Sequence, residues 1–151
     1  AELDPKSNLL DKIDALLHLE QNLNDLDLNH YQNLHEPTQN LTAILGAISR
    51  AKDELCSPAE YQKLGEKMLA EADSTDNEEL KLKAEKVLET AKVYHFYEQY
   101  LRDKKLLDFG DLVYRSVKLL RENEKVKREV CSRYEAILVD EFQDVNRACG
   151  I

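Results

Sequence analysis

Apolar side chains recur every three or four residues along most of this chain, and this period restricts it to helical architectures. The pattern covers stretches near residues 8–24, 41–55, 58–73 and 77–104, then the stretch from Asp108 to Leu120 and a short one around Val126 and Val130. The 151 residues include only 4 Gly and 3 Pro, too few turn residues for a β-rich fold. We therefore predict an all-α fold, a bundle of about five to six helices ending in a short strand-like or extended segment.

Polar residues stand where these helices should begin. Ser7 or Asn8 can cap the first helix, and Asp108 can cap the fifth. Ser57 can cap the third, with Pro58 at its first position, where a missing N–H costs nothing. The polar segment from Asn24 to Asn40 is predicted to be a loop.

Aromatic residues crowd the C-terminal end of the long helix: Tyr94, Phe96, Tyr97 and Tyr100. Such rings can stack on nucleic-acid bases, but aromatic residues at helical spacing are more often core residues. We expect them, and His95 among them, to be packed inside the protein.

Two features of the charge distribution point in opposite directions about nucleic-acid binding. The net charge of −9 opposes a polyanionic partner, whereas residues 115–133 carry seven basic and three acidic side chains. That stretch is a candidate electrostatic footprint, although a charged run is more often a solvated helix face.

Because no window is apolar enough for a membrane span and the N-terminus does not resemble a signal peptide, we expect no membrane partner and a cytoplasmic location.

No metal-binding spacing is present. The cysteines are three, widely spaced and without a Cys-x-x-Cys pair, so we interpret them as ordinary thiols: Cys56, Cys131 and Cys149. No Glu-x-x-His pair occurs among the histidines, which excludes a carboxylate-bridged metal centre in the bundle: His18, His30, His35 and His95.

The helical period stops at the apolar run 136–139, which is followed by Asp140 and Glu141. Such a run is typical of a buried parallel strand, and carboxylates at the end of that strand suit a nucleotide site of the Walker B kind. One carboxylate can hold Mg²⁺ and the other can orient the attacking water. A lone strand lacks neighbours, so here we expect the run to be extended, loosely packed or paired with another copy.

Val139-Asp140-Glu141-Phe142-Gln143-Asp144 is similar to the second conserved motif of UvrD/Rep/PcrA-type helicases. Upstream, Leu107-Asp108-Phe109-Gly110-Asp111-Leu112 resembles the Asp-Phe-x-x-Leu segment of the same family. The segments 48–55 and 57–61 look like the start of the helical insertion subdomain. The resemblance divides the chain into an N-terminal extension of the insertion (1–40), the insertion itself (41–134) and a piece of the ATPase motor domain (135–151).

The resemblance implies a parent protein that uses ATP and Mg²⁺ to move along single-stranded DNA and open the duplex. In that role Asp140 would bind the metal, Asp140 and Glu141 would contact the nucleotide, and Glu141 and Gln143 would be catalytic. The chain has no Gly-x-x-x-x-Gly-Lys phosphate loop. We therefore expect it to be inactive alone and to hold neither ATP nor Mg²⁺.

The same resemblance makes single-stranded DNA and the duplex junction the expected partners. Lys52 and Phe109 lie in family-like segments and are candidate DNA contacts, with packing at a helix start as the alternative for Phe109. The C-terminal segment is a candidate for self-association. A different class, a helical adaptor or oligomerisation module, would explain the long helix and the acidic charge but not the motif at 140–144.

Overall fold

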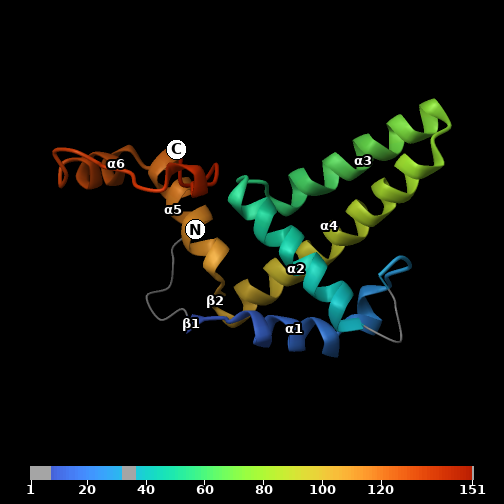
Figure 1. The fold of residues 1–151 in the computed structure, drawn as a ribbon. Coiled ribbons are helices and arrows are strands. Elements are labelled where there is room, and N and C mark those ends of the chain that lie inside the picture. The colour runs from blue at the N-terminus through green and yellow to red at the C-terminus, as the bar shows by residue number, and fades with distance from the viewer. Residues whose placement is uncertain (1–7, 32–36, 151) are drawn as a thin grey trace.

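A computed structural model describes residues 8–31 and 37–150, and in them the predicted all-α fold is confirmed (Figure 1). The α-helices are α1 (Lys12–Gln21), α2 (Pro37–Asp53), α3 (Pro58–Thr75), α4 (Glu78–Lys104), α5 (Phe109–Glu122) and α6 (Glu124–Cys131). Two 3-10 helices are η1 (Leu23–Leu26) and η2 (Phe142–Asp144). Strands β1 (Asn8–Leu9) and β2 (Leu106–Leu107) form a two-stranded parallel sheet.

Helices α3 and α4 form a long antiparallel hairpin, α2 crosses the C-terminal half of α4, and α5 and α6 extend to the other side (Figure 1). The main core lies where α1, α2 and α4 meet. Side chains with at most 2% exposure fill it, among them Leu19, Ile48, Val93, Tyr94 and Leu101. Burial of several large apolar side chains, each contributing roughly 1.5–3 kcal/mol, holds these helices together.

Two of the predicted helix caps are confirmed. Ser57 accepts the backbone N–H of Glu60, while the Glu60 carboxylate accepts the N–H of Ser57. Asp108 caps α5 in the same reciprocal way with Asp111. Both are capping boxes, which satisfy N–H groups that a helix start leaves free.

The start of α1 differs from the prediction. Its cap is Asp11, which accepts the N–H of Asp14 at 2.8 Å, rather than Asn8, and Ser7 lies outside the described residues. Asn8 is instead part of β1, and Leu10, the residue that follows this strand, donates its N–H to the Leu107 carbonyl at 2.7 Å. The backbone pairing with β2 fixes this segment before the helix can begin.

The segment predicted as a loop, residues 24–40, is a loop only in part. It begins inside η1, and α2 already starts at Pro37, while residues 32–36 lie outside the description. Its middle is fastened to α4, because the Glu89 carboxylate accepts the backbone N–H groups of Asn29 and His30, at 2.7 and 3.0 Å.

Two of the four clustered aromatic residues, Tyr94 and Tyr97, are buried as predicted. The other two are partly buried and stack on the His18 imidazole: Phe96 and Tyr100. The prediction that His95 is packed is wrong. It is exposed because it lies on the side of α4 opposite the face that carries Tyr94, Tyr97 and Leu101.

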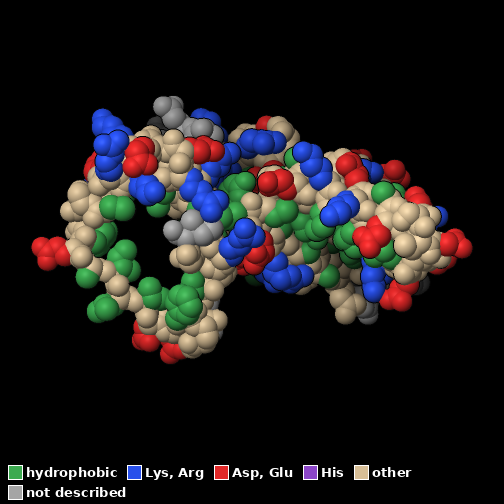
Figure 2. Space-filling model, turned by 90° about the horizontal axis from the view of Figure 1, so that it is seen from above, with side chains coloured by type: hydrophobic (Ala, Val, Ile, Leu, Met, Phe, Trp, Pro, Cys, Tyr) green, Lys and Arg blue, Asp and Glu red, His purple; other side chains and the backbone are tan. Residues whose placement is uncertain are grey.

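The run 136–139 forms no regular strand, and its side chains are open to solvent, Leu138 being 97% exposed. The C-terminal segment arches away from the helices around an opening at one end of the molecule (Figure 2). This is the loosely packed state expected for a strand without neighbours.

In the described part of the chain, the helices are too short or too polar to cross a membrane, and the three cysteines form no disulfide.

Candidate functional site

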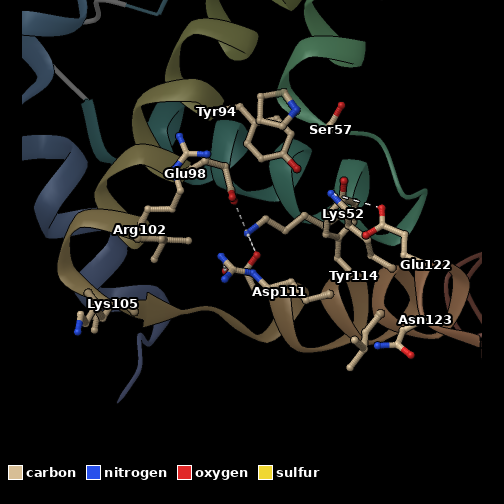
Figure 3. Close-up of a pocket in the computed structure, with 16 residues that line it drawn as sticks. Lys52, Ser57, Tyr94, Glu98, Arg102, Lys105, Asp111, Tyr114, Glu122 and Asn123 are labelled. Carbon is tan, nitrogen blue, oxygen red and sulfur yellow. Dashed lines mark hydrogen bonds and ion pairs between the residues drawn. The ribbon is translucent and has the colours of Figure 1, made fainter. Parts of the chain in front are cut away.

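The side chain of Lys52, in the last turn of α2, is at the centre of a buried ion cluster. Its ammonium lies 2.7 Å from an oxygen of Asp108, 2.7 Å from Glu98 and 3.1 Å from Asp111. The contact with Glu98 is an ion pair. Figure 3 shows Glu98 from α4 and Asp111 from α5 converging on the Lys52 side chain. One cation thus joins three helices.

The charges in this cluster offset each other. Burial disfavours the ammonium of Lys52, but the three carboxylates outweigh that effect and raise its pKa. Burial also raises the pKa of Glu98, with Lys52 opposing the shift. Arg115 adds a second cation 3.3 Å from Asp111, and the Tyr97 ring lies 5.4 Å from the Lys52 ammonium. Lys52 therefore ties the start of α5 to α2 through Asp108 and Asp111, and ties α4 to both through Glu98.

Gly110 and Phe109 form the first turn of α5 beside this cluster. A Cβ on Gly110 would lie 2.8 Å from the Cδ atom of Lys52, so only glycine fits so close to the lysine stem. The Phe109 side chain is 68% exposed and not packed at the helix start. It borders a cavity of about 430 Å³ between α1, α2 and α5, which Arg50 and Lys12 also line.

A larger cleft, of about 720 Å³, opens between α4 and α5 on the other side of the cluster (Figure 3). Basic side chains line it from both helices and the turn between them, namely Arg102, Lys105, Arg115 and Lys118. Glu98, Asp111 and Glu122 line it too, so the lining is mixed in charge rather than uniformly positive.

Three predicted site residues, Asp140, Glu141 and Gln143, lie together in one exposed turn. The N–H of Glu141 donates to the Asp140 carboxylate at 2.8 Å, and the Gln143 amide donates to the Glu141 carboxylate. Glu141 adopts a φ of 49°, in the left-handed region, which reverses the chain into η2. Lys52 and Phe109, the other two predicted residues, belong to α2 and α5 and do not join this turn.

Carboxylate oxygens are the ligands that Mg²⁺ prefers, so the exposed Asp140 carboxylate is chemically suited to hold Mg²⁺, and the adjacent Glu141 carboxylate is available to act on a water molecule. Within residues 8–31 and 37–150, no group of three or more His, Cys, Asp or Glu side chains converges as a metal site.

The segment just after the motif is fastened to the end of α2. The Asn146 side-chain amide donates to a carboxylate oxygen of Asp53 at 2.8 Å, and the Ala148 N–H donates to the Asp53 carbonyl at 2.9 Å. Ala148 is only 2% exposed. No sequence pattern identified Asp53 or Asn146, because they lie 93 positions apart.

The described residues form a helical bundle that continues into the exposed turn carrying Asp140, Glu141 and Gln143. The family model described as the UvrD/REP helicase N-terminal domain matches residues 1–149. The chain belongs to this family. The match includes the first 40 residues, which the sequence motifs alone did not place.

Curated relatives agree with this assignment. The chain is 29% identical to an ATP-dependent DNA helicase PcrA of Leuconostoc citreum over 126 residues, which are 83% of this chain and 14% of that protein. It is 32% identical to the PcrA helicases of Staphylococcus aureus Mu50 and Bacillus subtilis 168, over 69% and 70% of this chain and 12% of each relative. The chain thus spans about one eighth of the length of these relatives. No solved structure matches it.

Proposed function

We propose that this chain is the helical insertion subdomain of an ATP-dependent DNA helicase, followed by a segment in which the chain returns to the motor domain. The observation that carries the proposal is the motif from Asp140 to Asp144 in a member of the helicase family. The division into an extension (1–40), an insertion (41–134) and a motor segment (135–151) belongs to the same proposal, as does a cytoplasmic location. The full-length protein would move along single-stranded DNA and separate the duplex.

In the full-length protein, Asp140 would hold Mg²⁺ and Glu141 would orient and deprotonate the attacking water. When bound, ATP would supply the phosphoryl group, and Mg²⁺ would supply positive charge that neutralises the phosphate oxygens. Gln143 would act near the terminal phosphate. Its amide already contacts the Glu141 carboxylate, which supports a shared role in placing the water.

On the DNA side, the exposed ring of Phe109 is suited to stacking on a base, and Arg50 and Lys12 on the rim of the adjoining cavity are suited to phosphate. For Lys52 we propose an indirect role. Its ammonium is occupied by three carboxylates, so it would serve DNA binding by holding α5, and with it Phe109, in place.

The 151-residue chain alone would not hydrolyse ATP, because it carries no phosphate loop. Its open apolar run would instead favour self-association, since Ile137, Leu138 and Val139 are 80%, 97% and 58% exposed. In the full-length protein, neighbouring strands of the motor sheet would cover this run.

ATP hydrolysis tests the proposal directly. The chain should show no ATPase activity above background, while the full-length protein should show activity that DNA stimulates. In the full-length protein, Glu141→Gln should retain ATP binding, measured by fluorescent-nucleotide titration, and lose hydrolysis. Glu135→Gln, which neutralises an exposed carboxylate on the same segment, is the matched control and should behave as wild type. Hydrolysis by the 151-residue chain, or retained hydrolysis in Glu141→Gln, would contradict the proposal.

A further inference from the structure

Two successive residues at the end of α2 hold two different parts of the molecule. Lys52 binds the carboxylates of α4 and α5, and Asp53 binds the segment that follows the motif. We infer that Asp53 is a positioning residue, which fixes the polypeptide just beyond the nucleotide-site motif to the helical subdomain. The inference rests on the proposed function, and it names how the nucleotide site and the DNA-contacting helices are connected.

The anchor has two points of attachment on one residue. The Asp53 carboxylate accepts the Asn146 amide at 2.8 Å, and the Asp53 carbonyl accepts the Ala148 N–H at 2.9 Å. The last carbonyls of a helix have no partner within the helix, so Ala148 satisfies a group that α2 leaves free. The buried Ala148 methyl group adds apolar contact at the same place.

Asn146 is itself held in the orientation that the anchor needs. Its side-chain oxygen accepts the N–H of Cys149 at 2.9 Å, and its backbone carbonyl accepts the N–H of Gly150 at 3.1 Å. With the oxygen occupied within the turn, the amide nitrogen is directed to Asp53. The donor and acceptor roles across the contact are therefore fixed.

The connection to the motif is short. Only five positions separate Glu141 from Asn146, and part of that distance is the 3-10 helix η2. A movement of Glu141 that accompanies nucleotide binding or release would pull on the end of α2, where Lys52 holds the start of α5 that bears Phe109. The Asp53–Asn146 contact thus gives the helicase a direct route by which DNA contact affects the rate of ATP hydrolysis.

The fixed donor and acceptor roles allow a test by exchange. Asn146→Asp places two carboxylates against each other and should break the anchor. In the double variant Asp53→Asn with Asn146→Asp, the new amide at position 53 can donate to one oxygen of the new carboxylate. The other oxygen still accepts the Cys149 N–H. The exchange keeps the size of both side chains and reverses the direction of one hydrogen bond, so it should restore the anchor.

The first measurement is amide hydrogen exchange on the 151-residue chain. Protection of the Ala148 and Cys149 amides should fall about tenfold in Asn146→Asp. This corresponds to a decrease of about 1.4 kcal/mol in the free energy of local opening. Protection should recover in the double variant. Glu54→Ala is the matched control. It removes the neighbouring carboxylate, which is 61% exposed and 3.8 Å from Arg147, and should leave this protection unchanged. Unchanged protection in Asn146→Asp would overturn the anchor itself.

The second measurement is the ratio of DNA-stimulated to basal kcat for ATP in the full-length protein. Asn146→Asp should lower this ratio by about tenfold, within the range of ordinary coupling between sites. The double variant should restore it, and Glu54→Ala should not change it. A wild-type protein without ATPase activity would refute the proposed function. The hydrogen-exchange data would still show whether the Asp53–Asn146 contact holds this segment in place. An active wild type whose ratio is the same in Asn146→Asp, or stays low in the double variant, would overturn the coupling role.

Discussion

Asp108 accepts the Lys52 ammonium on one carboxylate oxygen, at 2.7 Å, and the Asp111 backbone N–H on the other, also at 2.7 Å. The residue that begins α5 is therefore also the residue that ties α5 to the end of α2. Neither role is independent of the other, because a rotation of the carboxylate that loses one partner also loses the other.

Replacement of Lys52 should be strongly destabilising. Lys52→Met keeps most of the apolar stem but leaves Glu98, Asp108 and Asp111 together in a largely buried site, where Arg115 pairs with Asp111. Removing one partner of a buried ion pair typically costs about 3–5 kcal/mol. Urea unfolding of the chain, followed by circular dichroism, should show a loss of that size. Lys83→Met, which breaks an exposed pair on α4, should leave the unfolding midpoint unchanged, and an equal loss in both variants would contradict the burial argument.

Glu98 should make the stability of the fold depend on pH. Its pKa is raised from 4.5 in the folded protein, chiefly by burial, so the folded state binds this proton more tightly than the unfolded chain does. Its contribution to the free energy of unfolding is therefore greatest at low pH, and is lost as the pH rises from about 4.5 through the raised pKa. Glu98→Gln removes that contribution.

Urea unfolding from pH 4 to 8 should accordingly show Glu98→Gln gaining stability relative to wild type as the pH rises. Glu78→Gln, at an exposed position of the same helix, provides the control. A stability difference for Glu98→Gln that stayed constant, or that changed in the opposite direction, would mean that burial does not dominate at this carboxyl group.

Replacement by alanine should change the stability of the fold in opposite directions at two glycine positions. The new methyl group in Gly110→Ala would meet the Lys52 stem at 2.8 Å, and that stem cannot move aside because its ammonium is held by three carboxylates. Overpacking of this kind costs about 1–3 kcal/mol. In Gly46→Ala the nearest atom is 3.5 Å away, so the better helix propensity of alanine should stabilise α2 by roughly 0.5–1 kcal/mol. Thermal unfolding of both variants checks the pair, and stabilisation by Gly110→Ala would refute the close packing.

Phe109 should matter for DNA but not for folding. Its side chain is 68% exposed, so Phe109→Ala should leave the unfolding midpoint nearly unchanged. If the ring stacks on a base, the substitution should weaken binding of single-stranded DNA by about 1–3 kcal/mol, roughly 5- to 150-fold. Fluorescence anisotropy with a labelled oligonucleotide and the full-length protein measures this. Tyr134→Ala removes another exposed ring, 63% accessible, and should have no effect, whereas equal affinities for wild type and Phe109→Ala would exclude stacking.

Much of the helical fold is predictable because its signals are local. The apolar period specifies each helix within its own residues, and the caps at Ser57 and Asp108 act over three positions. The β1–β2 pairing was missed because its partners are 98 positions apart and each strand has two residues, too short for a periodic signal.

The candidate site is predictable only where it is continuous in sequence. The Asp140–Asp144 motif could be recognised from its residues alone. The carboxylates around Lys52 come from α4 and α5, at separations of 46 to 59 positions, so sequence reasoning considered Lys52 as a DNA contact and did not find its partners. Burial, which decides what a lysine can reach, is a property of the assembled helices.

Self-association of the 151-residue chain should depend on the open run 136–139. Leu138 is 97% exposed and its neighbours Ile137 and Val139 also face solvent, so a second copy can pair with this run and cover its apolar side chains. Leu138→Asp places a charge in any such contact and should shift the chain toward monomer in sedimentation velocity at 10–100 µM. Leu64→Asp, at an apolar position on α3 that is 48% exposed, controls for the general effect of added charge. A wild-type chain that stays monomeric across this range, or equal dissociation by both variants, would show that the run does not direct association.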